Sequence, residues 1–177
     1  MRSLDNICEV FRAGGSCDLC SHMQETNYIK SLHFGTKHGI WKNLAHDNIP
    51  NGTVRYFIYA IDEPCPKMYV GLTTNLTTRF ANHKSSCNSR KSNATGLATH
   101  FKDGCPCDDG DRKKQILNLT ILDCFDSTPE KLRQSGHKNK YCECSECLRA
   151  KRIEDIWIAR LGTMHGSTAL NTKEDAV

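Results

Sequence analysis

Five residues of this chain carry the side-chain types that hydrolysis of a phosphate ester requires: Tyr59, Tyr69, Arg79, His83 and Glu154. Such a reaction needs an activated water, a cation that neutralises charge developing on the phosphate, and usually a metal held by a carboxylate. Tyrosine and histidine can act on the water, arginine can supply the cation, and glutamate can hold the metal. Each residue taken alone is more often a packing or surface residue. Their order along the chain favours a hydrolytic site.

The two tyrosines lie in segments with strand character. Residues 54–61 are rich in aromatic and β-branched side chains, residues 62–66 interrupt them with acids and prolines, and residues 68–72 form a second apolar run. This pattern predicts an antiparallel hairpin that places Tyr59 and Tyr69 on neighbouring strands.

A helix is predicted directly after this hairpin. Asn75 offers an N-cap, and Leu76, Phe80 and His83 recur on one helix face. Arg79 and His83 are then one turn apart. The start of this helix could also direct backbone N–H groups at an anion.

The rest of the chain completes a small mixed fold. Its further predicted elements are a short helix at 97–101, a strand at 115–123, a helix starting at Thr128-Pro129 and a helix at 148–161. Ile153, Trp157 and Leu161 recur every four residues and Gly162 ends the helix, so Glu154 lies beside a core-facing stripe. The order β-β-α-α-β predicts an α+β fold with a three-stranded antiparallel sheet flanked by helices.

Length and composition restrict the number of domains and the classes of protein that the chain can belong to. With 177 residues, we expect one catalytic domain at 51–177, a Cys/His segment at 1–50 and a Cys-rich insertion at about 103–147. No apolar run can span a bilayer and the start does not resemble a signal peptide, so we expect neither a membrane role nor secretion.

The charge of the chain permits a polyanionic partner without requiring one. The net charge is +4. The basic residues cluster in a stretch whose one acid is Asp103, and these are Arg79, Lys84, Arg90, Lys91 and Lys102. This local bias suits a phosphate backbone.

Eleven cysteines in a chain expected to stay in a reducing compartment indicate metal ligation rather than disulfides. A first zinc site is predicted from the spacing Cys17-x2-Cys20-x12-His33-x4-His38, with Cys8 and His22 as alternates. Buried free cysteines and solvated histidines are the competing interpretation.

A second zinc site is predicted for the Cys-rich insertion and the helix after it. The preferred ligands are Cys105, Cys107, Cys144 and Cys147, and Cys142 or His137 can substitute. Cys124, at the end of an apolar strand, is expected to belong to the core.

Two separated blocks of the chain resemble the GIY-YIG endonuclease family. The first contains Tyr-Phe-Ile-Tyr at 56–59 and Met-Tyr-Val-Gly-Leu-Thr-Thr-Asn-Leu-Thr-Thr-Arg-Phe-Ala-Asn-His at 68–83. The second contains Arg-Ile-Glu-Asp-Ile-Trp-Ile-Ala-Arg-Leu-Gly-Thr at 152–163 and the closing Ala169-Leu-Asn171, and is similar to the endonuclease domains of Penelope-like retroelements. Phe57 stands where the family usually has glycine and Val70 where it has isoleucine, and small family members lack the Cys-rich insertion.

This resemblance implies a role for each matching residue. Tyr59 and Tyr69 would position or help to deprotonate the attacking water, and Arg79 would steady the scissile phosphate. Glu154 would bind Mg²⁺ or Mn²⁺. His83 would serve as an additional base or phosphate contact, and Asn171 would orient the site, although a turn or helix-end role for Asn171 is an equal alternative.

The resemblance implies a nuclear DNA endonuclease that nicks or cleaves its target, with a reverse transcriptase domain on the same longer polypeptide for target-primed reverse transcription. One or two structural Zn²⁺ ions would accompany the catalytic metal. Two alternatives are a structure-specific nuclease of repair or recombination and a zinc-dependent DNA-binding module without activity.

Overall fold

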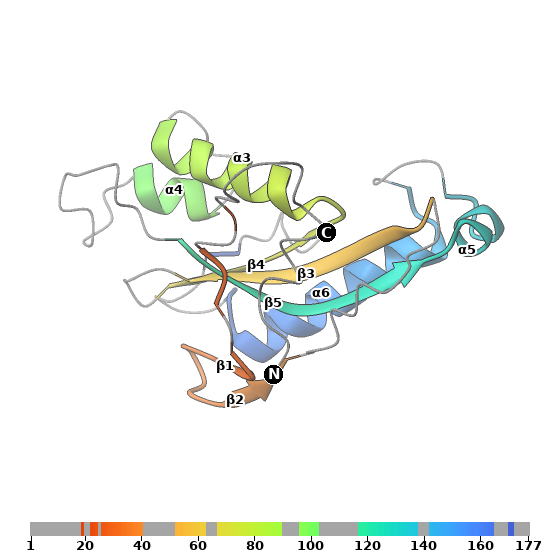
Figure 1. The fold of residues 1–177 in the computed structure, drawn as a ribbon. Helices are drawn as coiled ribbons and strands as arrows, with labels where there is room; N and C mark the ends of the chain where they lie inside the picture. The colour runs from red at the N-terminus through yellow and green to blue at the C-terminus, as the bar shows by residue number, and fades with distance from the viewer. Residues whose placement is uncertain are drawn as a thin grey trace.

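A three-stranded antiparallel sheet forms the centre of the molecule (Figure 1). The computed structural model describes residues 19, 22–24, 26–40, 52–62, 67–89, 96–102, 117–137, 142–164 and 170–171. The sheet has the order β4-β3-β5, with β3 (Val54–Asp62) between β4 (Met68–Thr73) and β5 (Asn118–Ser127). The hydrophobic residues of β3 are buried on both faces, which explains its nearly continuous apolar sequence.

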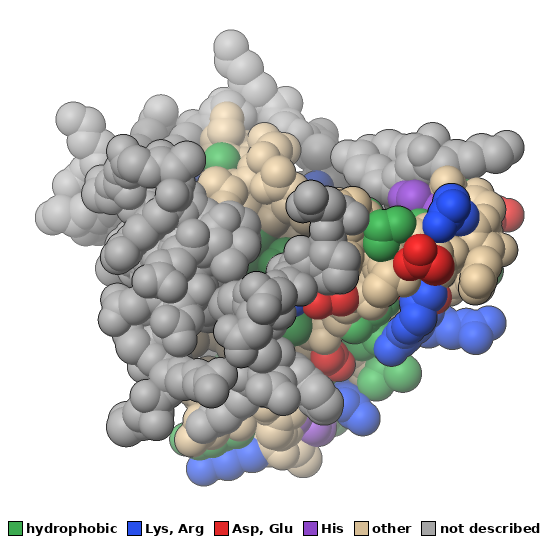
Figure 2. All heavy atoms as spheres, turned by 45° about the vertical axis from the view of Figure 1, so that its right-hand side comes forward, with side chains coloured by type: hydrophobic (Ala, Val, Ile, Leu, Met, Phe, Trp, Pro, Cys, Tyr) green, Lys and Arg blue, Asp and Glu red, His purple; other side chains and the backbone are tan. Residues whose placement is uncertain are grey.

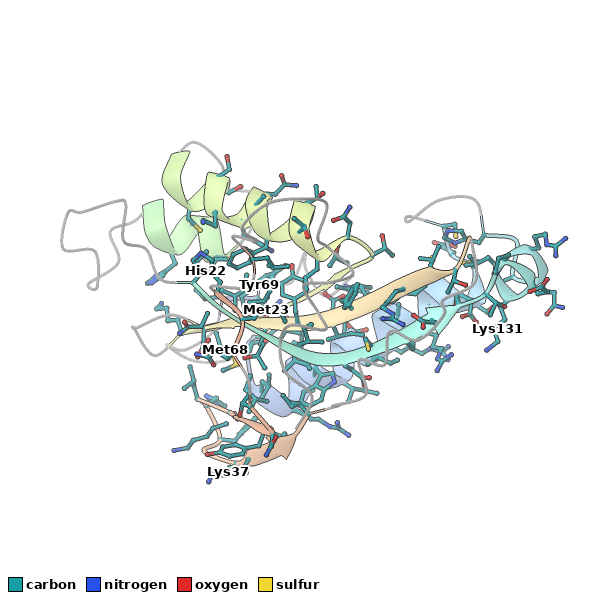
Figure 3. The ribbon with its side chains drawn as sticks, viewed as in Figure 1. His22, Met23, Lys37, Met68, Tyr69 and Lys131 are labelled. Atoms are coloured by element: carbon teal, nitrogen blue, oxygen red, sulfur yellow. The ribbon has the colours of Figure 1, made fainter. Side chains whose placement is uncertain are left out.

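Helices cover both faces of this sheet (Figure 1). On one face, α3 (Leu76–Ser89) and α4 (Gly96–Lys102) bury Leu76, Phe80 and Leu97 in a core with the two tyrosines. On the other face, α6 (Ser145–Leu161) packs Trp157, Ile158 and Leu161 against alternate residues of the same strands. Adjacent strand residues therefore serve different layers, as the period of two requires. Figure 3 shows this alternation at the labelled residues Met68 and Tyr69.

The strand register places the two tyrosines close together on the face covered by α3. Tyr59 pairs with Gly71 across β3 and β4, and Tyr69 pairs with Ile61. The pairing of β3 with β5 shifts between Ile58 and Tyr59. Such a bulge redirects the side chains beside it and commonly lies near a functional site.

Smaller elements lie at the two ends of the sheet. α5 (Pro129–Gln134) follows β5, and the Thr128 hydroxyl accepts a hydrogen bond from Lys131 N–H as its N-cap. A short hairpin of β1 (Tyr28–Lys30) and β2 (Lys37–Gly39) packs Ile29 into the core beneath α6. This hairpin is not evident from the sequence, because its three-residue strands are too short to show a period.

The predicted α+β class, the three-stranded antiparallel sheet and the element order are confirmed. Two predicted boundaries were wrong. β5 extends to Ser127 rather than ending at residue 123, because its second half still pairs with β3 as far as Val54. α6 begins at Ser145 rather than at 148, since Cys144 is the N-cap. The domain boundary predicted at residue 50 lies outside the described residues. Across the described ranges, no helix has the length and apolar character to cross a bilayer.

Candidate active site and metal cluster

Arg79, which is partly buried, joins the two buried tyrosines in one hydrogen-bonded group. Its Nε donates to the Tyr59 hydroxyl at 3.1 Å and its Nη2 donates to the Tyr69 hydroxyl at 3.3 Å. The Tyr59 hydroxyl also lies 2.7 Å from His83 Nε2. Because arginine only donates, Tyr59 accepts from Arg79 and is left to donate its own proton to His83. Four residues predicted from the sequence therefore meet between β3, β4 and α3.

Burial sets the protonation states in this group. Tyr59 is fully buried, and the loss of solvation raises its pKa above the ordinary value, with Tyr69 adding to the shift and Arg79 opposing it. His83 is 3% exposed, and burial together with the Arg79 charge lowers its pKa to about 3. At neutral pH, Tyr59 is a neutral phenol and His83 a neutral imidazole that can accept its hydrogen bond.

Gly71 provides the space that this arrangement needs. It lies opposite Tyr59 in the β3–β4 register, and a Cβ atom there would be 2.5 Å from the Tyr59 hydroxyl oxygen and 2.8 Å from a ring carbon of Tyr69. Neither ring can move far, since both are buried. The glycine is required here for close approach rather than for turn geometry.

Replacing Gly71 by Ala is expected to lower the free energy of unfolding by about 1–3 kcal/mol, because the added methyl overpacks a closed space. Urea denaturation followed by circular dichroism measures this loss. Gly39→Ala is the matched control, since a Cβ at Gly39 meets nothing within 4 Å. Equal stability of the two variants would contradict the steric role of Gly71.

The His83 shift predicts acid sensitivity of the fold. The folded state holds the His83 pKa near 3, while an unfolded histidine titrates near 6.5. Between these values the unfolded chain binds more protons, so stability is complete above the unfolded pKa and is lost as the pH falls. We expect a loss of about 2 kcal/mol from this residue between about pH 7.5 and about pH 5. In urea denaturation at both pH values, His83→Gln should lose less stability than the parent; equal losses would contradict the assignment.

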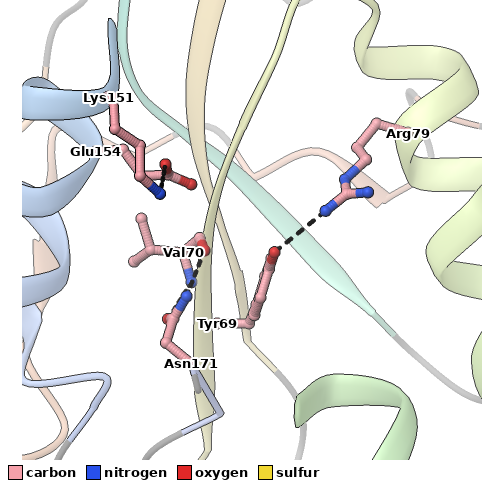
Figure 4. A network of polar contacts seen from close by, with 6 residues as sticks. All are labelled: Tyr69, Val70, Arg79, Lys151, Glu154 and Asn171. Atoms are coloured by element: carbon pink, nitrogen blue, oxygen red, sulfur yellow. Dashed lines mark hydrogen bonds and ion pairs between the residues drawn. The ribbon is translucent and has the colours of Figure 1, made fainter. Parts of the chain in front are cut away.

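Glu154 is a buried acid on α6 with a charged neighbour. Its side chain is 8% exposed, and the Lys151 ammonium lies 3.1 Å from Oε2, one helical turn away. Figure 4 shows this pair on one side of β4 and the Tyr69–Arg79 contact on the other. The negative charge of Glu154 contributes to the raised pKa of Tyr59, so the two groups interact electrostatically past the edge strand.

Asn171 hydrogen-bonds to the backbone of β4, which is an edge strand of the sheet. Its Oδ1 accepts from Val70 N–H at 2.9 Å and its Nδ2 donates to Val70 C=O at 2.7 Å, as Figure 4 shows. The amide thus pairs with the edge strand as another strand would. Asn171 therefore holds the segment at 170–171 against β4, one residue from Tyr69. Its orienting role at the site stays a prediction.

A second group of polar residues lies at the start of α6. One ligand atom each from His137, Cys142, Cys144 and Cys147 lies within 4.8 Å of the others, so this cluster could hold a metal ion. It contains Cys144 and Cys147 of the predicted second site together with both of its alternates. Cys105 and Cys107, the other preferred ligands, lie outside the described residues.

Only half of the predicted first zinc site falls in the described chain. His33 lies in the turn between β1 and β2 and packs edge-on to Phe34, while His38 lies on β2 with its Nε2 2.9 Å from the Thr36 hydroxyl. Cys17 and Cys20, like the alternate Cys8, lie outside the described residues. The alternate His22 lies 3.0 Å from the Leu117 carbonyl oxygen through Nδ1. The segment between His33 and His38 is a hairpin turn, not a helix.

The sequence did not identify every residue that contacts the candidate site or the Cys/His cluster. Lys151, Gly71 and Tyr56 act only through contacts that depend on the tertiary fold, and of these only Gly71 had a local signal as a glycine inside a strand. Cys124 packs against the core as predicted.

On the face drawn in Figure 2, basic and acidic side chains of the described residues are interspersed. The charge there does not form a surface of one sign.

The described residues thus contain a largely buried Tyr–Tyr–Arg–His group, a buried acid on α6, an amide paired with β4 and a Cys/His cluster. Buried ionisable groups of this kind concentrate at functional sites. When the chain is compared with protein-family models, with curated proteins and with solved structures, none of the three comparisons finds a match.

Proposed function

We propose that this chain is a metal-dependent DNA endonuclease that hydrolyses phosphodiester bonds, with a core of the GIY-YIG type. The observation that carries the proposal is the contact of Arg79 with both tyrosines, with His83 on Tyr59. A packing role accounts poorly for a partly buried guanidinium held between two phenol oxygens, because its partial desolvation is costly. A phosphate-binding role does account for it.

Arg79 supplies the cation in this proposal. Its guanidinium has five N–H donors in a fixed plane, and the contacts with Tyr59 and Tyr69 involve only Nε and Nη2. The tyrosines therefore fix the plane and direction of the group before substrate arrives. A preorganised cation of this kind stabilises charge that develops on a phosphate without reorganising during the reaction.

Tyr59 and His83 form a neutral hydrogen-bonded pair in this proposal. Tyr59 is held neutral by burial, so it does not act as a phenolate base. Its hydroxyl lies 2.7 Å from the neutral His83 Nε2, and this hydrogen bond fixes the direction of the phenol. The Tyr69 hydroxyl, held by Arg79, is positioned to orient the attacking water.

Glu154 fits the requirements of a Mg²⁺ or Mn²⁺ ligand. Mg²⁺ typically binds one or two carboxylates and completes its shell with water and substrate phosphates. Glu154 offers one carboxylate that already attracts a cation, the Lys151 ammonium at 3.1 Å. A divalent ion bound there would neutralise charge on the phosphate and leaving oxygen. Lys151 would then remain beside the carboxylate as a second contact for the DNA backbone.

The biological setting is the more specific part of the proposal. Similarity of residues 54–171 to endonuclease domains of Penelope-like retroelements supports nicking of nuclear target DNA, to prime a reverse transcriptase on the same longer polypeptide. The Cys- and His-rich segments support structural Zn²⁺ beside the catalytic metal. These ions would add rigidity or DNA contact, not chemistry.

Incubating the purified, zinc-loaded chain with supercoiled plasmid and Mg²⁺ or Mn²⁺ tests the proposal. We expect divalent-metal-dependent conversion to the nicked or linear form, and sequencing of the ends gives strand number and target preference. Faster cleavage of flap or junction substrates than of linear duplex would favour a repair nuclease. Retained DNA binding without cleavage in either metal would refute the enzymatic proposal.

A further inference from the structure

We propose that His137, Cys142, Cys144 and Cys147 form a closed Zn²⁺ site that fastens the start of α6 to the central sheet. The four residues lie in the order His-x4-Cys-x-Cys-x2-Cys between α5 and the first turn of α6. The ligand set differs from the one preferred on sequence grounds, because it needs neither Cys105 nor Cys107. It is also independent of the proposed nuclease chemistry.

The distances between the four ligand atoms are close to those in a tetrahedral zinc site. His137 Nδ1 lies 3.2 Å from Cys142 Sγ, 3.4 Å from Cys144 Sγ and 3.5 Å from Cys147 Sγ, and the Sγ atoms of Cys142 and Cys147 are 3.5 Å apart. Usual Zn–S and Zn–N bond lengths in a regular tetrahedron place ligand atoms about 3.6–3.8 Å apart. Three thiolates and one imidazole would fill all four coordination positions of the zinc ion. Four protein ligands are typical of structural rather than catalytic zinc.

Local backbone structure directs the ligands toward one another. Gly136 follows α5 with a φ of 69°, and this left-handed residue turns the chain so that His137 faces the cysteines. Cys144 is the N-cap of α6 but makes no side-chain capping bond, so its sulfur is directed into the cluster instead.

An outer contact links the cluster to the sheet. The Tyr56 hydroxyl of β3 lies 3.6 Å from Cys147 Sγ, and the Tyr56 ring stacks on Phe125 of β5 at 5.0 Å. Arg149 of α6 lies over the Phe125 ring, with its guanidinium carbon 4.4 Å from the ring centroid. Hydrogen bonds from neighbouring groups commonly fix zinc ligands and moderate thiolate charge. Tyr56 is the residue that performs this role here.

A disulfide is not the better explanation of the cluster. The Cys142 and Cys147 sulfurs are 3.5 Å apart, whereas a disulfide needs about 2.05 Å. Three cysteines would leave one thiol unpaired beside an imidazole. Zinc uses all four groups at once. The site would anchor α6 at its N-terminus, about 15 Å along the helix axis from Glu154.

Cobalt substitution of the full chain tests the ligand set. After chelation and reloading with Co²⁺, we expect the visible bands of tetrahedral cobalt and the near-ultraviolet band of thiolate-to-cobalt charge transfer. Cys142→Ser with Cys147→Ser should lose one bound metal ion per chain and most of this charge-transfer intensity. Cys124→Ser is the matched control, because Cys124 is a half-buried thiol of β5 outside the cluster.

His137 is the most specific member of the set and has its own test. His137→Cys should retain the metal, with a spectrum shifted by a fourth thiolate, whereas His137→Ala should bind it more weakly. Zinc removal should lower the parental Tm by about 5 °C or more, and the double serine variant should not respond at this site. Full metal content and unchanged spectra in the double serine variant would overturn the proposal. Metal loss in Cys105→Ser with Cys107→Ser, but not in His137→Ala, would overturn this ligand set.

Discussion

Glu154→Gln should lower the rate of metal-dependent plasmid nicking by about 100-fold or more, because the amide keeps the shape of the side chain but removes its negative charge. Glu154 is the buried acid whose charge acts on Tyr59, and the Lys151 ammonium already lies at 3.1 Å from it. Without that charge, a divalent cation would lose the carboxylate that we propose as its ligand. The initial rate of nicking, measured over a range of Mg²⁺ and Mn²⁺ concentrations, checks the prediction.

Glu130→Gln is the matched control for this substitution. Glu130 lies on α5 with a side chain that is 67% exposed and pairs with Arg133 on the surface. The same loss of one negative charge should leave nicking unchanged there. Circular dichroism and thermal melting must show that the Glu154 variant is folded. A folded Glu154→Gln protein that nicks at the parental rate would exclude Glu154 as the catalytic ligand.

Arg79→Lys is expected to reduce nicking by about 100-fold although it preserves the positive charge. The guanidinium contacts both phenol oxygens through two different nitrogens, at 3.1 Å for Tyr59 and 3.3 Å for Tyr69. A lysine ammonium is a single point of charge and cannot bridge the tyrosines and hold a phosphate in one fixed plane. The loss should fall mainly on the single-turnover rate with DNA in excess of its dissociation constant.

Arg133→Lys on α5 controls for a general effect of replacing arginine. Its side chain is 77% exposed, so the conservative change should alter neither stability nor nicking. DNA binding by the Arg79 variant, measured without divalent metal, should weaken much less than nicking does. If binding and nicking fell by the same factor, Arg79 would be a ground-state DNA contact and not a group that acts in the transition state.

The local elements were determined by the sequence alone. Alternating and helical periods located β3, β4, α3 and α6, and cap residues such as Thr128 and Gly162 marked ends correctly. These signals are local, since they depend on side chains a few residues apart. The C-terminal end of β5 was missed because pairing with β3 extends that strand beyond its own apolar pattern.

Residue types at the candidate site were likewise predictable, but their arrangement was not. The sequence placed Tyr59, Arg79 and Glu154 on the correct elements. The roles implied by their resemblance to GIY-YIG endonucleases stay predictions. The 2.7 Å contact of Tyr59 with His83, and the burial that keeps both neutral, depend on how α3 packs over the sheet. Burial and hydrogen bonding alter pKa values only once distant segments are in contact.

The cysteines show most clearly which features the sequence predicts and which depend on the tertiary fold. Their number and spacing identified metal ligation as the expected chemistry, and they named Cys144 and Cys147 with two alternates. Spacing could not choose among the remaining thiols, because ligands far apart in the chain are equivalent until the fold brings some of them together. In the described chain, the left-handed Gly136 and the N-cap position of Cys144 bring His137 and Cys142 beside the start of α6. The fold therefore places these two residues, together with Cys144 and Cys147, in one cluster that could hold a metal ion.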